Sequence, residues 1–352
     1  MSTKVTTIAT KSLRWAALTL VLAAAGCITV NTGGAAPAGG GEPADPEDVA
    51  AQLAQPVAGR LVRLLAASMD GTYTALGTSL AESMTDAEPR LQVAVSSGSV
   101  DNLTMISLGN AEMAMVQLDV LRGIGLSGLY RDPLARVRVV APLHLEEVHI
   151  LVRKDAGISS LSDLGGKRVS VGPGASGSYF SAKALLRRAG VDLDNVDLTH
   201  VPTERAVDGL LSGKSDAVFF TGGQPVPFLA SLPAATAETV SLLDLGDDPA
   251  KGLGAQDLTY LSSRIAAGTY AWVPAEVRTV ATPCVLIAHV DAHAGVVRAV
   301  LKAMFDRQAS LTKTHPKWAQ VNVATSHKLR ETGDQPFHPG AEAYLDGLKA
   351  TP

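Results

Sequence analysis

A glycine-rich turn at residues 172–179 has the residue types of an anion-binding site. It reads GPGASGSY and lies between an apolar segment that ends at Val171 and a helical pattern that ends at Arg188. The first N–H groups of a helix have no partner within the helix and carry the positive end of its dipole, so they attract anions. The alternative is that a serine of this turn only caps the helix. We predict that five residues of the turn contact a ligand: Gly174, Ala175, Ser176, Gly177 and Ser178.

Two earlier turns have a similar character. Residues 71–73 read GTY, and residues 97–99 read SGS. Glycine lets the backbone approach a ligand, hydroxyl groups form hydrogen bonds, and tyrosine offers an aromatic surface with a polar end. Ordinary turn chemistry is the alternative. We predict a second group of ligand contacts: Gly71, Thr72, Tyr73, Ser97, Gly98 and Ser99.

Polar residues also follow two apolar strands. Gln117 ends the segment MAMVQ, and Thr221 and Gly222 follow the segment AVFF. We predict that all three contact the ligand. The alternatives are an edge residue for Gln117 and a turn for Thr221 and Gly222.

Alternating strands and helices would position these turns. Residues 76, 80 and 84 are apolar at helical spacing, and residues 91, 93 and 95 alternate as in a half-buried strand. Further apolar strands are expected at 148–153 and 280–287. This alternation predicts an α/β fold with mostly parallel sheets covered by helices. Ligands bind such sheets at the carboxyl ends of the strands, where the turns lie.

The motifs of enzymes are weak in this chain. Residues 172–177 satisfy G-x-G-x-x-G, which occurs in dinucleotide-binding enzymes, but Asp192 and Asp194 lie in a loop and not at a strand end. His289 and His293 are four residues apart in an expected surface turn, which disfavours a metal. No G-x-S-x-G motif occurs. We predict a protein that is not an enzyme and that has no cofactor and no metal.

The N-terminus has the layout of an export signal. Three basic residues precede an apolar stretch that ends at Ala25 and is too short to span a bilayer. Cys27 follows Ala-Ala-Gly, which resembles a lipobox, although Ala24 stands where leucine is usual. We predict lipidation of Cys27 and anchoring to a lipid bilayer. Cleavage after Ala25, which would release the protein, is the alternative.

Composition restricts the class of protein further. With 46% hydrophobic and 18% charged residues, the chain is globular and well cored. The net charge is −4, and removal of residues 1–26 takes away three positive charges, so a nucleic-acid partner is disfavoured. Gly, Ala and Pro dominate the segment after the signal, which predicts a flexible tether at residues 27–54. Cys284 is expected to be a small buried side chain in a strand.

Seven short motifs occur in order within residues 57–347. They are GTY with Leu76-Gly77 at 71–77, SGSVDNL at 97–103, AEMAMVQ at 111–117, GPGASG at 172–177, DAVFFT at 216–221, AGTY at 267–270 and PFHPGAE at 336–342. In this order they resemble the TAXI-type solute receptors of tripartite ATP-independent periplasmic (TRAP) transporters. One departure is LHLE at 143–146, where relatives commonly have LYPE. His144 would either make binding pH-sensitive or be a substitution that faces the hinge.

The resemblance implies a two-lobed type II periplasmic-binding-protein fold. In this fold each lobe is a mostly parallel sheet flanked by helices, and two crossover strands join the lobes. The expected organisation is an export signal at 1–26, a tether at 27–54, lobe 1 at 55–148 and 284–352, and lobe 2 at 149–283.

The resemblance also implies a function. An extracytoplasmic receptor of this kind, periplasmic or membrane-anchored, would capture a small organic carboxylate by closing its cleft. The solute would be an amino acid such as glutamate, or a dicarboxylate, and the receptor would deliver it to TRAP membrane permease subunits. The alternatives are a stand-alone sensor or surface lipoprotein of the same fold and, less favoured, a dinucleotide-binding enzyme.

Overall fold

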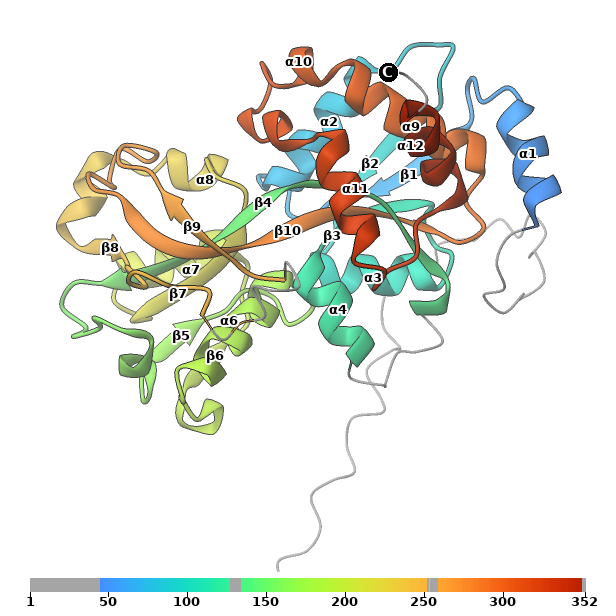
Figure 1. The fold of residues 1–352 in the computed structure, drawn as a ribbon. Coiled ribbons are helices and arrows are strands. Elements are labelled where there is room, and N and C mark those ends of the chain that lie inside the picture. Colours follow the sequence, from blue (N-terminus) through green and yellow to red (C-terminus); the bar gives the residue numbers. More distant parts are fainter. Residues whose placement is uncertain (1–44, 127–133, 252, 254–258, 350–352) are drawn as a thin grey trace, which may run out of the picture. The chain divides into compact units, whose positions relative to one another are not determined.

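One ten-stranded sheet runs through the described part of the chain (Figure 1). The computed structural model describes residues 45–126, 134–251, 253 and 259–349, and the predicted export signal and Cys27 lie outside them. The described residues belong to one compact unit, Gly40–Pro352. The strands are β1 Leu61–Leu65, β2 Arg90–Ala94, β3 Met113–Gln117, β4 Val137–Arg153, β5 Arg168–Ser170, β6 Asp197–Thr199, β7 Ala217–Gly222, β8 Val240–Leu242, β9 Leu261–Ile265 and β10 Val277–His289.

Helices connect most of these strands. They are α1 Pro46–Ala54, α2 Thr72–Ser83, α3 Ser99–Ser107, α4 Leu118–Leu126, α6 Gly177–Arg188, α7 Thr203–Leu211, α8 Pro227–Ala230, α9 Ala294–Asp306, α10 Gln308–Leu311, α11 Val323–Glu331 and α12 Pro339–Lys349. Short 3-10 helices lie at η1 Leu161–Leu164, η2 Leu193–Asn195, η3 Ala234–Glu238 and η5 Pro316–Gln320.

The strand order separates two parallel groups. It runs β2-β1-β3-β10-β4-β7-β5-β6, with β8 beside β4 and β9 beside β10. β1 is parallel to β2 and β3, and β5 is parallel to β6 and β7. The predicted α/β class, with parallel strands flanked by helices, is confirmed.

Two long antiparallel strands join the groups. β4 has 17 residues and β10 has 13, and they pair with each other from Val137 opposite His289 to Glu147 opposite Ala281. β10 also pairs with β3, and β4 also pairs with β7. The crossover segments expected near residues 149–153 and 281–287 are therefore parts of longer strands.

Buried hydrophobic side chains of the described residues form separate clusters. One cluster takes its members from residues 62–143 and 284–345. Two others take theirs from residues 148–280 and 151–277. Only β4 and β10 contribute to both sides of this division, and the predicted lobe boundaries fall on these two strands.

The end of the predicted tether is a helix. Asp45 caps α1 by accepting a hydrogen bond from the Glu47 amide, and proline stands at its first turn. The Gln52 side chain accepts a hydrogen bond from the Ala294 amide at the start of α9 (2.8 Å). A flexible tether over 27–54 is therefore wrong for residues 46–54, because capping and this docking contact hold them.

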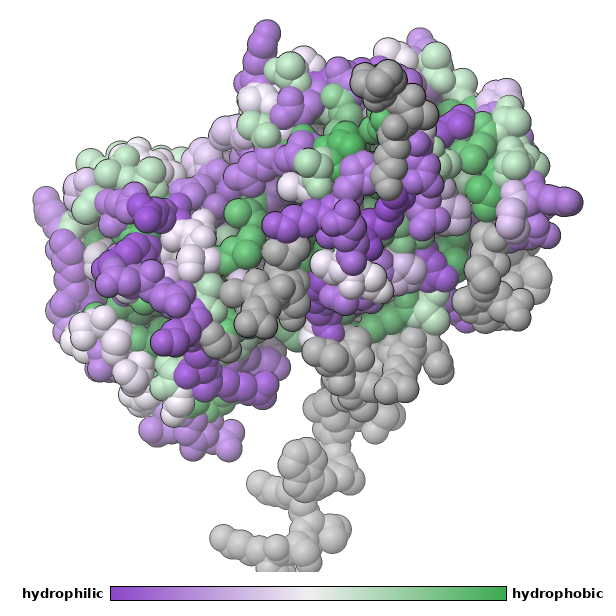
Figure 2. All heavy atoms as spheres, viewed as in Figure 1, coloured by the Kyte–Doolittle hydropathy of each residue, from purple (hydrophilic) through white to green (hydrophobic). Residues whose placement is uncertain are grey.

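Hydrophilic side chains cover much of the face seen in Figure 2, and hydrophobic ones form smaller groups between them. Among the described residues, no helix combines the length and the apolar character that crossing a membrane requires.

Candidate ligand-binding site

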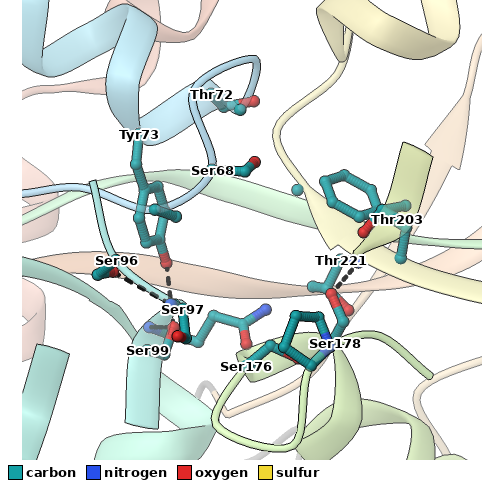
Figure 3. A pocket seen from close by; sticks show the side chains of 18 of the residues that line it. Ser68, Thr72, Tyr73, Ser96, Ser97, Ser99, Ser176, Ser178, Thr203 and Thr221 are labelled. Carbon is teal, nitrogen blue, oxygen red and sulfur yellow. Dashed lines mark hydrogen bonds between the residues drawn. The ribbon is translucent and has the colours of Figure 1, made fainter. Parts of the chain in front are cut away.

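A cavity of about 280 Å³ is lined by the starts of four helices. Gly71, Thr72 and Tyr73 begin α2, and Gly98 and Ser99 begin α3. Ser176, Gly177 and Ser178 begin α6, and Pro202, Thr203 and Glu204 begin α7. Figure 3 shows the labelled serine, threonine and tyrosine side chains around this cavity. The positive ends of four helix dipoles thus lie at one cavity.

Most of the residues predicted from the sequence line this cavity together. They are Gly71, Thr72, Tyr73, Ser97, Gly98, Ser99, Gln117, Ser176, Gly177, Ser178, Thr221 and Gly222. Gly174 and Ala175 are not among the lining residues. The Ala175 carbonyl instead accepts hydrogen bonds from the amides of Val100 and Asp101 in the first turn of α3 (3.1 and 3.2 Å). Part of the anion-binding capacity of α3 is therefore used inside the protein.

The serines of the glycine-rich turn have structural partners as well. Ser176 Oγ accepts a hydrogen bond from the Tyr179 amide and so caps α6 (3.2 Å). Ser178 Oγ accepts one from the Thr221 amide (2.9 Å). The capping alternative thus holds for Ser176. Both serines also line the cavity, so each of them holds a backbone amide and also faces the space where a solute would lie.

The starts of α3 and α6 lie very close to each other. Gly98 has a φ of +113°, which favours glycine, and a Cβ there would lie 3.2 Å from Ser176 Cα. A Cβ on Gly177 would lie 1.4 Å from Gln117 Oε1. These glycines let two turns that are distant in the sequence form one wall of the cavity.

The carboxyl ends of β3 and β7 and the middle of β4 supply polar groups below the helix starts. The Gln117 side chain is 1% exposed, and neither its oxygen nor its nitrogen forms a hydrogen bond within the described residues. Thr221 Oγ1 is likewise without a hydrogen bond there. Buried polar groups in such a state are costly unless a further group satisfies them. Both residues line the cavity with polar atoms that have no hydrogen bond within the described residues.

Glu146 lines the same cavity from β4, and we did not predict it as a contact. It is 2% exposed, and burial raises the pKa of its carboxyl to about 8. At neutral pH this group is mostly protonated and can donate a hydrogen bond. The motif LHLE contains it, but only the position of β4 at the centre of the sheet brings it to the cavity.

Other contacts missed from the sequence come from loops and strand ends. They are Ala67, Ser68, Ser96, Pro173, Pro202, Thr203, Glu204 and Phe220. Ser68 and Ser96 lie just before turns that we did identify, so extending each turn toward its strand would have found them. Thr203 and Glu204 are the first residues of α7, and only the fold brings this helix start to the cavity.

His144 is not among the residues that line this cavity; it lines a separate pocket and is 3% exposed. Burial, with Lys317 adding to the effect, lowers the pKa of its imidazole to about 3. The side chain is therefore neutral over the physiological range. The pH sensitivity that we considered for this residue does not arise from His144 itself.

Several hydrogen bonds join the two parallel strand groups around the cavity. Thr72 Oγ1 donates to the Gly223 carbonyl (2.8 Å). Asp119, at the start of α4, accepts hydrogen bonds from Ser181 Oγ in α6 and from Tyr260 Oη (2.8 and 2.5 Å). With the Ala175 contacts on α3, these bonds hold the cavity walls together.

Asp119 predicts a pH dependence of stability. Burial raises the pKa of its carboxyl from 3.8 to about 6, and its hydrogen bonds only partly oppose this rise. Between these pH values the folded protein binds more protons than the unfolded chain, so its stability falls as pH rises from about 4 to 6. Between about pH 4 and 6 we expect Asp119 to lower the free energy of unfolding of the parent by about 3 kcal/mol, and we expect this decrease to be absent in Asp119→Asn. Urea unfolding at both pH values measures the effect. The same change in the free energy of unfolding with pH in parent and variant would refute it.

Comparison with solved structures shows a related fold. The chain is similar to the alkanesulfonate-binding protein SsuA from Xanthomonas axonopodis pv. citri bound to MOPS, with 14% identity, TM-score 0.44, and coverage of 83% of this chain and 84% of that chain. It is similar to an ancestral arginine-binding protein bound to arginine, with 15% identity, TM-score 0.46, and coverage of 73% and 97%. It is also similar to the substrate-binding protein of an amino acid ABC transporter, with 12% identity, TM-score 0.46, and coverage of 74% and 99%.

All three of these structures are named as binding proteins. A family model matches residues 64–346, so the chain belongs to the NMT1-like family. The match spans all four helix starts at the cavity. The finer TAXI and TRAP assignment stays a prediction.

Proposed function

We propose that this protein is an extracytoplasmic solute-binding receptor that captures a small organic anion. The observation that carries the proposal is the convergence of four helix N-termini on one cavity. Each contributes positive dipole potential, and together they favour a negative ligand. The similar solved structures include binding proteins for an alkanesulfonate and for an amino acid, which supports a solute of this size.

The lining groups point to a carboxylate. Among the described residues no arginine or lysine lines the cavity, and Glu204 lines it with Glu146, so backbone N–H groups and hydroxyls would hold the anionic group. A protonated Glu146 would donate a hydrogen bond to a second oxygen of the solute. A cavity of about 280 Å³ is at the small end for ligand sites, which fits an acidic amino acid or a short dicarboxylate.

Binding would involve closure between two lobes, residues 55–148 with 284–352 and residues 149–283. The separate hydrophobic clusters and the two long strands between them support this division. Thr72, Asp119 and Ala175 form contacts that a closed form makes across the cavity. The long strands would absorb the rotation as a hinge.

Calorimetry with matched solutes tests the anion assignment. Glutamate, succinate and longer dicarboxylates are titrated beside their neutral primary amides. We expect at least one carboxylate to bind more than about tenfold more tightly than its amide, because only the anion gains from the helix dipoles. Equal affinities within every pair would contradict the proposal.

We further propose that the receptor serves a TRAP-type permease, on the strength of the ordered motifs. An ABC transporter is the rival that the similar structures suggest, because their names include one. Uptake into vesicles that contain the receptor and the permease encoded beside its gene distinguishes a TRAP-type permease from an ABC transporter. A sodium gradient without ATP should drive uptake, whereas a strict requirement for ATP would exclude the TRAP assignment. A stand-alone sensor would show binding with neither form of uptake.

Residues 1–26 and Cys27 remain part of the proposal as export signal and lipid-anchor site, giving a periplasmic or membrane-anchored location. Metabolic labelling with palmitate should mark the parent and not Cys27→Ala. Release of unlabelled parent protein would favour ordinary cleavage after Ala25.

A further inference from the structure

Three side chains with metal-ligating atoms meet beneath the cavity. His144 and Glu146 are two residues apart on β4, so they share one face of the sheet. Cys284 lies on the neighbouring strand β10, where the register shifts between Pro283 and Val285. One ligating atom from each of the three lies within 4.8 Å of the others. Gln117, the β3 partner of Cys284, and Glu146 itself line the cavity, so the cluster adjoins it.

The separations suit a small cation. Tetrahedral zinc with nitrogen, oxygen and sulfur ligands at about 2.0–2.3 Å places neighbouring ligand atoms about 3.5 Å apart. His144 Nε2 and Glu146 Oε1 are already 3.5 Å apart. The Cys284 sulfur lies within 4.8 Å of both atoms, so its approach would complete a three-ligand set.

The polar atoms of this cluster lack other partners. His144 Nδ1 and Nε2 and Glu146 Oε1 form no hydrogen bond within the described residues. All three side chains are at most 3% exposed. Buried groups of this kind are usually paired or coordinate a metal.

Charge in the neighbourhood also favours a cation. A second buried carboxylate, Glu147, is paired with Lys317, whose Nζ lies 2.8 Å from Oε1 and 2.9 Å from Oε2. The nearby lysine is therefore neutralised by Glu147. Glu146 lies beside His144, Tyr73, Gln117 and the Cys284 thiol, and none of these side chains is a compensating cation. A bound divalent ion would balance the carboxylate and the thiolate that ligate it.

We propose that His144, Glu146 and Cys284 bind one borderline-soft divalent transition ion, with Zn²⁺ as the natural candidate. Imidazole, carboxylate and thiolate are the ligand types of zinc, and three protein ligands leave one coordination position open. The ligands bind the ion as thiolate, carboxylate and neutral imidazole. The open position adjoins Gln117 and the cavity, so a carboxylate solute could take it. In the metal-bound protein Glu146 would ligate the ion and would not donate a hydrogen bond to the solute.

Cobalt titration of the metal-free full-length protein tests the site, since Co²⁺ replaces Zn²⁺ and absorbs visible light. We expect one Co²⁺ per chain, a thiolate-to-cobalt charge-transfer band in the near ultraviolet, and displacement of cobalt by Zn²⁺. Cys284→Ser should remove the charge-transfer band, whereas its matched control Cys27→Ser should keep it. His144→Asn should weaken binding more than about tenfold, and His293→Asn should not.

Two results with Co²⁺ can overturn the proposal, one in the parent protein and one in the folded Cys284→Ser variant. No charge-transfer band at saturating Co²⁺, or a band that survives in folded Cys284→Ser, would exclude this site. The Zn²⁺ affinity, measured by competition with a chelator, gives a second readout. An affinity that folded Glu146→Gln leaves unchanged would remove Glu146 from the ligand set. Neither measurement uses an organic solute, so failure here leaves the receptor proposal untouched.

Discussion

Gly177→Ala is expected to weaken solute binding more than about tenfold, or about 1.4 kcal/mol. The new Cβ would lie 1.4 Å from Gln117 Oε1 and 2.9 Å from Ser99 Oγ. Gln117 is 1% exposed, so it can escape only by turning its amide into the cavity that it lines. Calorimetry with the solute that binds the parent most tightly measures the loss.

Gly174→Ala is the matched control in the same turn. A Cβ at Gly174 meets no atom within 4 Å, and this residue does not line the cavity. We expect parent-like affinity and a parent-like melting temperature. If both alanine variants bind as the parent does, the start of α6 is not part of the site. If Gly174→Ala loses more solute affinity than Gly177→Ala, the solute contacts Gly174, which does not line the cavity.

Lys317→Met is expected to destabilise the fold by about 3–5 kcal/mol. The Lys317 and Glu147 side chains are 4% and 3% exposed, so the substitution leaves a buried carboxylate without its cation. Glu147 Oε2 also accepts a hydrogen bond from the Gln224 amide, just beyond the site residues Thr221 and Gly222 (3.0 Å). We therefore expect weaker solute binding as well. Guanidinium unfolding measures the stability.

Lys302→Met provides the same chemical change at an exposed ion pair. Lys302 and Asp306 are 62% and 49% exposed on α9, and such pairs contribute at most about 1 kcal/mol. Equal effects of the two substitutions would mean that the buried pair carries no special weight. A stable Lys317→Met variant would show that Glu147 becomes protonated at little cost.

Local sequence identified the helix starts because the signal and the structure are both local. Glycine and serine at residues 71–73, 97–99 and 172–178 mark turns wherever the rest of the chain lies. The strand-end residues Gln117 and Thr221 followed from the same logic. All of the predicted ligand contacts except Gly174 and Ala175 line one cavity.

Contacts between residues that are far apart in the sequence could not be predicted from local sequence patterns. Glu146 reaches the cavity because β4 pairs with β10 and β7 at the centre of the sheet. The Ala175 carbonyl is used by α3, whose first turn lies about 75 residues earlier. Cys284 was expected as a plain buried side chain, and only the register of β10 against β4 brings it to His144 and Glu146.

The end of the tether shows the same limit. Residues 46–54 have a capped and proline-started helix pattern, which a composition argument over 27–54 did not separate from its neighbours. What holds α1 is the hydrogen bond that its Gln52 side chain accepts from the Ala294 amide. That amide is at the start of α9, more than two hundred residues away.

The cavity at the four helix starts is expected to hold a small organic anion. Native mass spectrometry of protein purified without denaturation measures this most directly, because the mass of a retained solute names it. We predict an adduct that carries a carboxylate, is lost on denaturation, and is strongly reduced in Gly177→Ala but retained in Gly174→Ala. A neutral or cationic adduct, or one that Gly177→Ala retains at parent level, would contradict the account.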